Sequence, residues 1–185
     1  MSLIVLVGPA GVGKGSVVKE LLKHGGYRLS VSATTREPRA GEVDGQHYHF
    51  VSSSEFEQMI ENAELIEWAK VHGNHYYGTP KAELERAAAE SAHLILEIDL
   101  QGARQIAGAG IEHIGIFLEP PSWEELERRL RSRGTETESE IQTRLATARE
   151  ELAAADEFEN RLVNDDLGTT AQRIRELVTK REEKK

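Results

Sequence analysis

The sequence contains no cysteine and no long apolar run. Without cysteine the chain can form neither a disulfide framework nor a thiolate metal site, and it has no cysteine nucleophile, so a reducing compartment is its natural setting. The apolar run near the start, Leu3–Val7, is too short for a signal peptide or a membrane span. We therefore expect a soluble, cytoplasmic protein without a membrane partner.

An excess of positive charge is also missing. The 185 residues include 23 Lys and Arg against 32 Asp and Glu, which gives a formal net charge of −9. Proteins that coat nucleic acid need a surplus of Lys and Arg facing the phosphates, so we exclude this class and keep only a local basic site. The apolar share of 38%, together with 16 glycines, is ordinary for a globular chain, and the length fits one domain without internal repeats.

Strand and helix patterns alternate along most of the chain and predict an α/β fold. Continuous apolar runs, typical of strands buried on both faces of a parallel sheet, occupy Leu3–Val7, 93–98 and 111–118. Helices are expected over 14–24, 122–133, 140–155 and 171–185, and a short last strand over 161–163. The sequence from Ser122 to Glu125 has the form of a capping box. Residues 30–90 hold short alternating segments and one helix near 55–60, which indicates a small mixed β lobe.

A glycine-rich segment follows the first predicted strand and opens the first predicted helix. Its residues are Gly8, Pro9, Ala10, Gly11, Val12, Gly13, Lys14, Gly15 and Ser16. This matches the Walker A pattern, in which backbone N–H groups and a helix N-terminus face phosphate oxygens and the lysine neutralises the β- and γ-phosphates. Gly15 stands where the pattern has Ser or Thr for Mg²⁺, so Ser16 is the remaining hydroxyl for the metal. The motif predicts a core of the P-loop NTPase type.

A second candidate for the metal site is an acidic residue at the end of a neighbouring strand. Asp99 stands just after the apolar run of residues 94–98, in which only Glu97 is charged. A carboxylate there can organise hydrated Mg²⁺ beside the phosphates. Carboxylates at strand ends also serve as caps or turn residues. We therefore predict Asp99 and Ser16 as metal-binding residues and keep a capping role for Asp99 as the alternative.

Arginine is concentrated in two places, and guanidinium groups match phosphate oxygens bidentately. Arg36 and Arg39 flank a proline in a loop-like stretch where the pattern offers them no carboxylate partner.

The second group of arginines lies on the 122–133 helix and beyond it. For Arg128 and Arg131, pairing with glutamates of the same helix is favoured. Arg129, Arg133 and Arg144 are instead predicted to belong to a lid that carries positive charge onto a polyphosphate when it closes.

Taken together, these segments resemble the guanylate kinase family nearly from end to end. The matching stretches are GPAGVGKG, SVSATTREPRAGEVDG, YHF, IEWAKVHGN, YYGTP, EIDLQGA, FLEPPS, RGTET and VND. The resemblance implies ATP-dependent phosphorylation of GMP to GDP, and of dGMP, by direct in-line transfer with Mg²⁺, in purine nucleotide metabolism. It also implies three parts: a core of about 1–31, 92–125 and 157–185, a GMP-binding lobe of about 32–91, and a helical lid of about 126–156.

The resemblance also implies residue roles, carried over by matching position. GMP is bound by Ser32, Arg36, Arg39, Tyr48, Glu67, Tyr77, Thr79 and Asp99. Of these, Arg36, Arg39, Tyr48 and Tyr77 hold the GMP phosphate. Ser32, Glu67 and Thr79 among these read the guanine, whose N1–H and N2–H₂ one carboxylate can accept together, a donor pair that adenine lacks. The catalytic residues are Lys14, Arg36, Arg129, Arg133 and Arg144, and Asn164 lies near the adenine of ATP.

Two departures from the family pattern and two alternatives stay open. His47 precedes Tyr48 where relatives commonly have Asp, and one extra residue makes Tyr76 an alternative to Tyr77 at the GMP phosphate.

A kinase for another nucleoside monophosphate would share the P-loop and the lid. A binding module of the guanylate-kinase-like type would bind phosphopeptides without catalysis, and measurable ATP affinity separates it from a kinase. The sequence does not indicate whether the protein is a monomer or a homo-oligomer.

Overall fold

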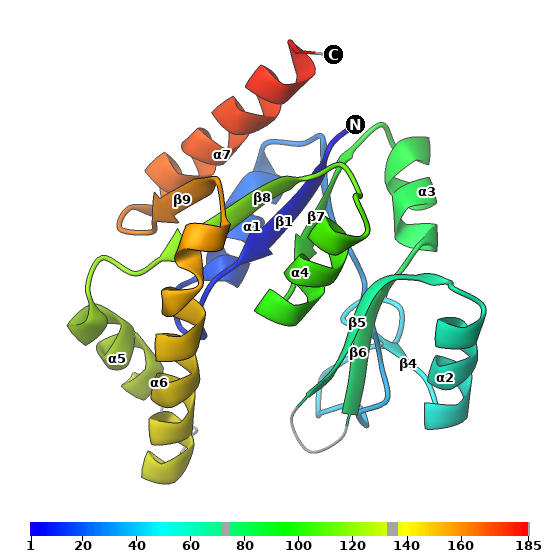
Figure 1. Ribbon diagram of the computed structural model, residues 1–185, viewed down its shortest axis with the longest axis horizontal. Helices are drawn as coiled ribbons and strands as arrows, with labels where there is room; N and C mark the ends of the chain where they lie inside the picture. Colours follow the sequence, from blue (N-terminus) through cyan, green and yellow to red (C-terminus); the bar gives the residue numbers. More distant parts are fainter. Residues whose placement is uncertain (72–74, 133–136, 185) are drawn as a thin grey trace.

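The computed structural model describes residues 1–71, 75–132 and 137–184, and its centre is a parallel sheet of five strands (Figure 1). The strands are β1 (Leu3–Val7), β2 (Tyr27–Leu29), β7 (His93–Glu97), β8 (Ile114–Glu119) and β9 (Asn160–Val163). Their order is β2-β7-β1-β8-β9, and each neighbouring pair is parallel. All five residues of β1 are buried, because a central parallel strand is covered on both faces.

Helices cover both faces of this sheet (Figure 1). They are α1 (Lys14–Lys23) and α7 (Leu167–Glu182) on one face, and α3 (Ala82–Ala89) and α4 (Leu100–Gly108) on the other. Alternate residues of β1 divide between two cores, with Ile4 and Leu6 on the α1 side and Leu3, Val5 and Val7 on the α4 side. Each such burial contributes about 1.5–3 kcal/mol, so β1 firmly anchors the loop that follows it.

A second, smaller sheet is inserted between β2 and α3. Its strands are β3 (Ala33–Thr34), β4 (His49–Phe50), β5 (Leu65–Val71) and β6 (His75–Pro80), in the order β4-β3-β6-β5. β3 and β4 are parallel and the other pairs are antiparallel. α2 (Ser53–Glu61) packs on this sheet, where the fully buried Phe56 stacks on Tyr76 with ring centroids 5.1 Å apart. The small lobe therefore has a hydrophobic core of its own.

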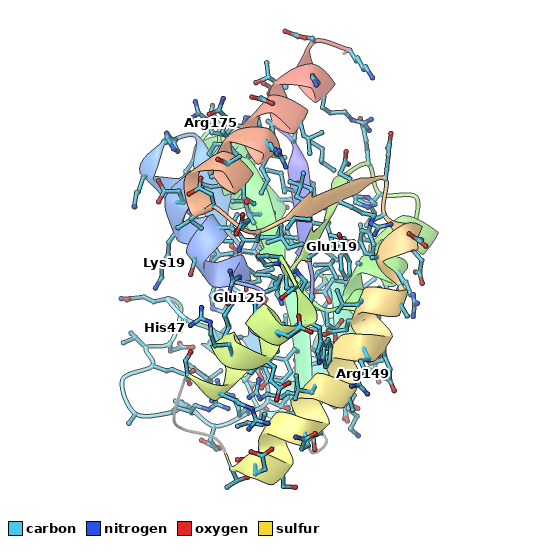
Figure 2. All side chains as sticks on the ribbon, turned by 90° about the vertical axis from the view of Figure 1, so that its left-hand side faces the viewer. Lys19, His47, Glu119, Glu125, Arg149 and Arg175 are labelled. Carbon is cyan, nitrogen blue, oxygen red and sulfur yellow. The ribbon has the colours of Figure 1, made fainter. Side chains whose placement is uncertain are left out.

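Two further helices, α5 (Trp123–Arg131) and α6 (Glu138–Ala153), follow β8 and lie side by side. Figure 2 faces these helices and labels Glu125 on α5 and Arg149 on α6. The Arg149 guanidinium lies 4.8 Å from the centre of the Trp123 ring. Leu126 and Leu130 of α5 and Ile141 and Leu145 of α6 join the core on the α1 side. The short 3₁₀ helix η1 (Ala155–Glu157) then leads into β9. Within the described ranges, none of the helices has both the length and the apolar character needed to cross a membrane.

The predicted fold class is confirmed: a parallel sheet flanked by helices, with a small mixed lobe and a helical pair. Two predicted element starts lie furthest from those in the structure, while α6 and β9 begin within two residues of their predicted starts. β8 begins at Ile114 rather than at 111, because the Ile111 N–H still closes the end of α4 by donating to the Ile106 carbonyl at 3.3 Å. α7 begins before residue 171, because Asp166 caps it by accepting the Thr169 N–H at 2.7 Å.

The capping box predicted at the start of α5 forms only in part. Ser122 Oγ accepts the N–H of Glu125 at 3.1 Å, whereas the Glu125 carboxylate accepts hydrogen bonds from Arg128 and Arg129, both at 2.7 Å. The charged partners on the next turn outcompete a neutral backbone N–H. α5 ends at Arg131, and its predicted end at residue 133 lies outside the described residues.

Candidate active site

The glycine-rich loop turns tightly between β1 and α1, at the carboxyl end of the central strand. Gly13, the N-cap of α1, has a φ of 99°, and Gly8 has a φ of 148°. A Cβ atom would lie 2.6 Å from the Asn164 Nδ2 at Gly13 and 2.5 Å from the Leu118 carbonyl oxygen at Gly8. Both positions therefore require glycine, for backbone conformation and for space. The result is a backbone cradle at a helix N-terminus, suited to phosphate.

Side chains from distant parts of the chain hold this loop. Asn164 is buried, and its Nδ2 donates to the Val12 carbonyl oxygen at 2.8 Å. Arg129 of α5 donates from Nη1 to the same oxygen at 3.2 Å and to the Asn164 carbonyl at 3.3 Å. Lys14 lies over the loop, with Nζ donating to the Gly8 carbonyl at 2.5 Å. The predicted residues Asn164 and Arg129 thus contact the backbone of the P-loop at Val12.

A cavity of about 340 Å³ lies between the P-loop and the small sheet. The predicted site residues that line it are Ala10, Lys14, Ser32, Tyr48, Glu67, Tyr77 and Asp99. The fold therefore brings the P-loop lysine and most of the predicted GMP-binding residues to the same cavity.

Glu67 and Thr79 lie opposite each other on β5 and β6. The Thr79 hydroxyl donates to Glu67 Oε1 at 2.6 Å, and Glu67 is only 5% exposed. Burial raises the pKa of the Glu67 carboxyl to about 7; the Thr79 hydrogen bond opposes this rise and the charge of Asp99 adds to it. A ligand that donates N–H groups to this carboxylate would favour its ionised form.

Two carboxylates of the cavity were missed by the sequence analysis: Glu97 at the end of β7 and Glu151 of α6. Partial burial raises the pKa of both carboxyls, and the charge of Lys14 opposes that rise. Glu97 stands two residues before Asp99 in extended chain, where alternate side chains point the same way, so this spacing could have identified it. Glu151 has no comparable signal, because it lies in a helix rich in glutamate.

The capping alternative for Asp99 is realised. Its Oδ1 accepts the Gly102 N–H at 2.8 Å at the start of α4. Because a carboxylate has two oxygens, the residue can cap the helix and still face the cavity that it lines. Ser16 is exposed on α1 and lies outside the lining. Across the described residues, no group of three or more His, Asp or Glu side chains is arranged to hold a metal ion by itself.

Arg36 lies beside two of the predicted phosphate-binding tyrosines. Its Nε donates to the Tyr77 hydroxyl at 3.1 Å, and its guanidinium lies 5.4 Å from the centre of the Tyr48 ring. The prediction that no carboxylate pairs with this stretch was wrong. Glu42 accepts Arg36 Nη2 at 2.9 Å and the backbone N–H of Arg39 at 2.7 Å, and these hydrogen bonds lower the pKa of Glu42. The loop folds back on itself, which neither helical nor strand periodicity can anticipate.

Tyr76 and Tyr77 point in different directions, as neighbouring residues of a strand do. The Tyr76 ring packs in the core of the small lobe against Phe56 and Trp68. Tyr77 lines the cavity and accepts the hydrogen bond from Arg36. Of the two, Tyr77 is therefore the better placed to contact a ligand.

The remaining arginines divide as follows. The predicted pairing of Arg128 and Arg131 is confirmed: Arg128 contacts Glu125, and Arg131 contacts Glu127 and also Glu138. Arg39, which is exposed, and Arg144, which is half-buried on α6, lie outside the cavity lining, and Arg133 falls outside the described residues.

A family model described as guanylate kinase matches residues 1–181. The chain belongs to the guanylate kinase family. A guanylate kinase of Synechocystis sp. is 49% identical over 181 residues, which cover 97% of this chain and 94% of the relative. One of Clostridioides difficile is 45% identical over 183 residues, covering 98% and 89%. The crystal structure of guanylate kinase from Anaplasma phagocytophilum superposes with a TM-score of 0.74 at 31% identity, over 97% of this chain and 85% of that one. The family resemblance inferred from the motifs is confirmed.

Proposed function

We propose that this guanylate kinase transfers the γ-phosphoryl group of ATP to GMP in one in-line step, giving ADP and GDP, and that dGMP is a second acceptor. The observation that carries the proposal is that Lys14 of the P-loop and Glu67 of the small lobe line the same cavity. A donor nucleotide on the loop and an acceptor on the lobe would meet there. Holding two reactants in this way makes their reaction effectively unimolecular.

Guanine recognition is assigned to the buried pair on β5 and β6. Glu67 would accept the N1–H and N2–H₂ groups of guanine, with Thr79 holding one carboxylate oxygen and Ser32 lining the same space. Adenine presents no such donor pair, and its binding would leave the buried Glu67 carboxylate with Thr79 as its donor but without the two guanine donors. The cost of that loss favours GMP over AMP.

The phosphate of GMP is assigned to Arg36, Tyr48, Tyr77 and Arg39. Glu42 holds the Arg36 guanidinium in place through a hydrogen bond at 2.9 Å. A phosphate carries more negative charge than one carboxylate and can compete for the same guanidinium donors.

Mg²⁺ fits the carboxylates that line the cavity together with Lys14. In nucleotide sites this ion is usually held by one or two carboxylates together with phosphate oxygens and water, so a complete protein cage is not needed. Asp99 and Glu97 would hold its hydration shell, which leaves the exposed Ser16 as the weaker candidate. When bound, the ion neutralises charge on the phosphates during transfer.

The remaining cations are assigned to the transferred phosphoryl group. Lys14 would neutralise it from the P-loop, and Arg129, Arg133 and Arg144 would approach on the α5–α6 pair as a lid. Asn164 donates a hydrogen bond to the Val12 carbonyl of the loop and would lie near the adenine. No covalent intermediate is required, because positioning and positive charge supply most of the catalysis in phosphoryl transfer. Closure of the lobes would also exclude water that could accept the phosphoryl group.

The experiment that tests this proposal is the initial rate of ADP formation from MgATP with GMP, dGMP, AMP, CMP, UMP and dTMP offered separately. We expect turnover with GMP and dGMP only. Turnover with another acceptor would keep the kinase and contradict the role of Glu67. Binding of ATP without turnover of any acceptor would instead favour a binding module.

A further inference from the structure

Helix α4 docks on the strand that carries Glu67. Gln105 binds both backbone groups of Trp68: its Oε1 accepts the Trp68 N–H at 3.1 Å, and its Nε2 donates to the Trp68 carbonyl at 2.5 Å. One helical turn earlier, Gly102 lies directly against the neighbouring Glu67. Residues three apart lie on the same helix face, so this face of α4 forms a platform under the guanine-reading strand.

The contact at Gly102 leaves no room for a side chain. A Cβ atom built there would lie 2.6 Å from Glu67 Oε2 and 3.2 Å from both Glu67 Cδ and Ile98 Cδ1, so the tightest contact is with the Glu67 carboxylate. Gly102 is an ordinary helical position, since it is absent from the residues with positive φ, and its N–H is capped by Asp99. Backbone conformation therefore does not require glycine at this position, whereas the closeness of Glu67 does.

A methyl group at this position would be accommodated mainly by Glu67. The Glu67 Oε1 is held by Thr79 at 2.6 Å and the side chain is buried, so the carboxylate cannot swing into solvent without breaking that hydrogen bond. The α4 backbone is held on the other side by the two Gln105 hydrogen bonds. A methyl group at Gly102 would therefore displace the carboxylate that reads the guanine, at the cost of its hydrogen bond from Thr79.

We propose that Gly102 is a positioning residue for guanine recognition, because its missing side chain makes the space in which the Glu67 carboxylate sits while it faces the cavity. The inference rests on the proposed function, in which Glu67 binds guanine. On this proposal, the preference of the site for guanine depends on Gly102 of α4, although Gly102 has no side chain with which to bind the nucleotide.

The test compares Gly102→Ala with Gly108→Ala in the same helix. Among the described residues, and apart from its chain neighbours and the backbone of its own helix, no atom lies within 4 Å of a Cβ built at Gly108. Alanine is the better helix former, so Gly108→Ala should keep the wild-type KM for GMP and an equal or higher Tm. Gly102→Ala should raise the KM for GMP roughly tenfold or more, the scale of a lost hydrogen bond to a charged group. Its KM for ATP should stay within about twofold of the wild-type value, which a general loss of structure would not allow.

A second substitution makes the test independent of stability. Aspartate at position 67 withdraws the carboxylate by one methylene group, so Glu67→Asp alone should raise the KM for GMP. In the Glu67→Asp background, Gly102→Ala should then have little further effect, because the tightest contact, at 2.6 Å from Glu67 Oε2, is relieved. Such non-additivity identifies a direct contact between the two positions. If Gly102→Ala alone fails to fold, recovery of folded enzyme in the double variant supports the proposal, and failure to recover overturns it.

Two results separate the inference from the function on which it rests. A folded Gly102→Ala enzyme with an unchanged KM for GMP overturns the role of Gly102, provided that Glu67→Gln raises that KM. An unchanged KM for GMP in Glu67→Gln instead overturns the assignment of Glu67, and the inference about Gly102 with it.

Discussion

Neighbouring residues make the P-loop side of the cavity, whereas side chains from distant strands make the lobe side. The loop presents backbone groups between Gly8 and Gly13, whose left-handed or otherwise glycine-specific conformations shape the cradle. In the lobe, Glu67 meets Thr79 and Arg36 meets Tyr77 only because β3, β5 and β6 pair. The P-loop therefore presents backbone groups and a single lysine to the cavity, with Asn164 and Arg129 supporting the loop. The lobe instead presents several side chains, each of which should contribute separately.

The largest loss of activity is expected for substitution of Lys14, the lysine side chain that the P-loop presents to the cavity. Lys14→Met removes the cation over the loop, and we expect kcat to fall by about 10²–10³-fold or more, the scale of a lost preorganised charge contact. Lys19→Met is the matched control, because Lys19 is exposed on the same helix (Figure 2). Steady-state kinetics and a melting curve check both variants. Retained kcat in Lys14→Met would show that the loop does not act as a phosphate site.

The connection between the core and the small lobe, where Glu83 of α3 binds the segment after β2, should also be sensitive to substitution. Glu83 of α3 is fully buried; its Oε2 accepts the Val31 N–H at 3.0 Å, and its Oε1 accepts Arg86 Nη1 at 2.8 Å. Arg28 Nε lies 3.7 Å from the same carboxylate. The residue thus ties the segment that leaves the core to the helix that returns to it.

Glu83→Ala should lower the free energy of unfolding by about 1–3 kcal/mol, because it leaves the half-buried Val31 N–H without its charged acceptor. Urea unfolding measures the loss, with the exposed Glu85→Ala on the same helix as the control. If this connection serves the lobe alone, the folded fraction keeps its KM for ATP and changes its KM for GMP. Equal urea midpoints in the two variants would remove Glu83 from this role.

An intermediate effect is expected at the guanine pair. Glu67→Gln replaces one acceptor oxygen by an NH₂ donor and should cost about 1.5–3 kcal/mol of GMP binding, the scale of a hydrogen bond to a charged group. The KM for ATP should not change, since the P-loop does not depend on this side chain. Isothermal titration with GMP gives the binding loss directly, and an equal loss for both nucleotides would contradict the division between the two regions.

The same residue makes GMP binding and stability respond oppositely to pH. The pKa of Glu67 is raised to about 7 and guanine needs the ionised carboxylate, so GMP affinity should increase as pH rises through about 7. The unfolded carboxyl has a pKa of 4.5, so stability is fully present below that value and is lost as pH rises through about 7.

The difference in unfolding free energy between Glu67→Gln and the wild type should therefore change with pH. From acid to above pH 7, it should shift in favour of Glu67→Gln by about 3 kcal/mol. Urea unfolding of both proteins across the pH range measures this difference. A difference that does not vary with pH would show that the carboxyl is not titrated by folding.

The contrast between the two regions also decides what could be predicted from the sequence. β1, the P-loop and α1 form one continuous segment, so apolar periodicity and the glycine pattern were sufficient to place them. β2 was not predicted, because its three half-buried residues are too few for a periodic signal. The Arg36–Glu42 pair and the approach of Gly102 to Glu67 were also missed, since both arise from folding rather than from local spacing. The roles of the lobe residues came from the family resemblance, because a lone strand glutamate such as Glu67 carries no pattern.

The smallest effect should distinguish two adjacent tyrosines. Tyr77→Phe removes the hydroxyl that accepts the hydrogen bond from Arg36 Nε at 3.1 Å. It should weaken GMP binding by about 0.5–1.5 kcal/mol, the net value of one hydrogen bond, and so raise the KM for GMP. Tyr76→Phe keeps the ring that stacks on Phe56 and should leave that KM unchanged. The two variants differ only in which face of β6 loses a hydroxyl, so a larger effect at Tyr76 would place the phosphate on the opposite face. An effect at Tyr77 alone would show that even single lobe side chains contribute measurably, as a site built from side chains requires.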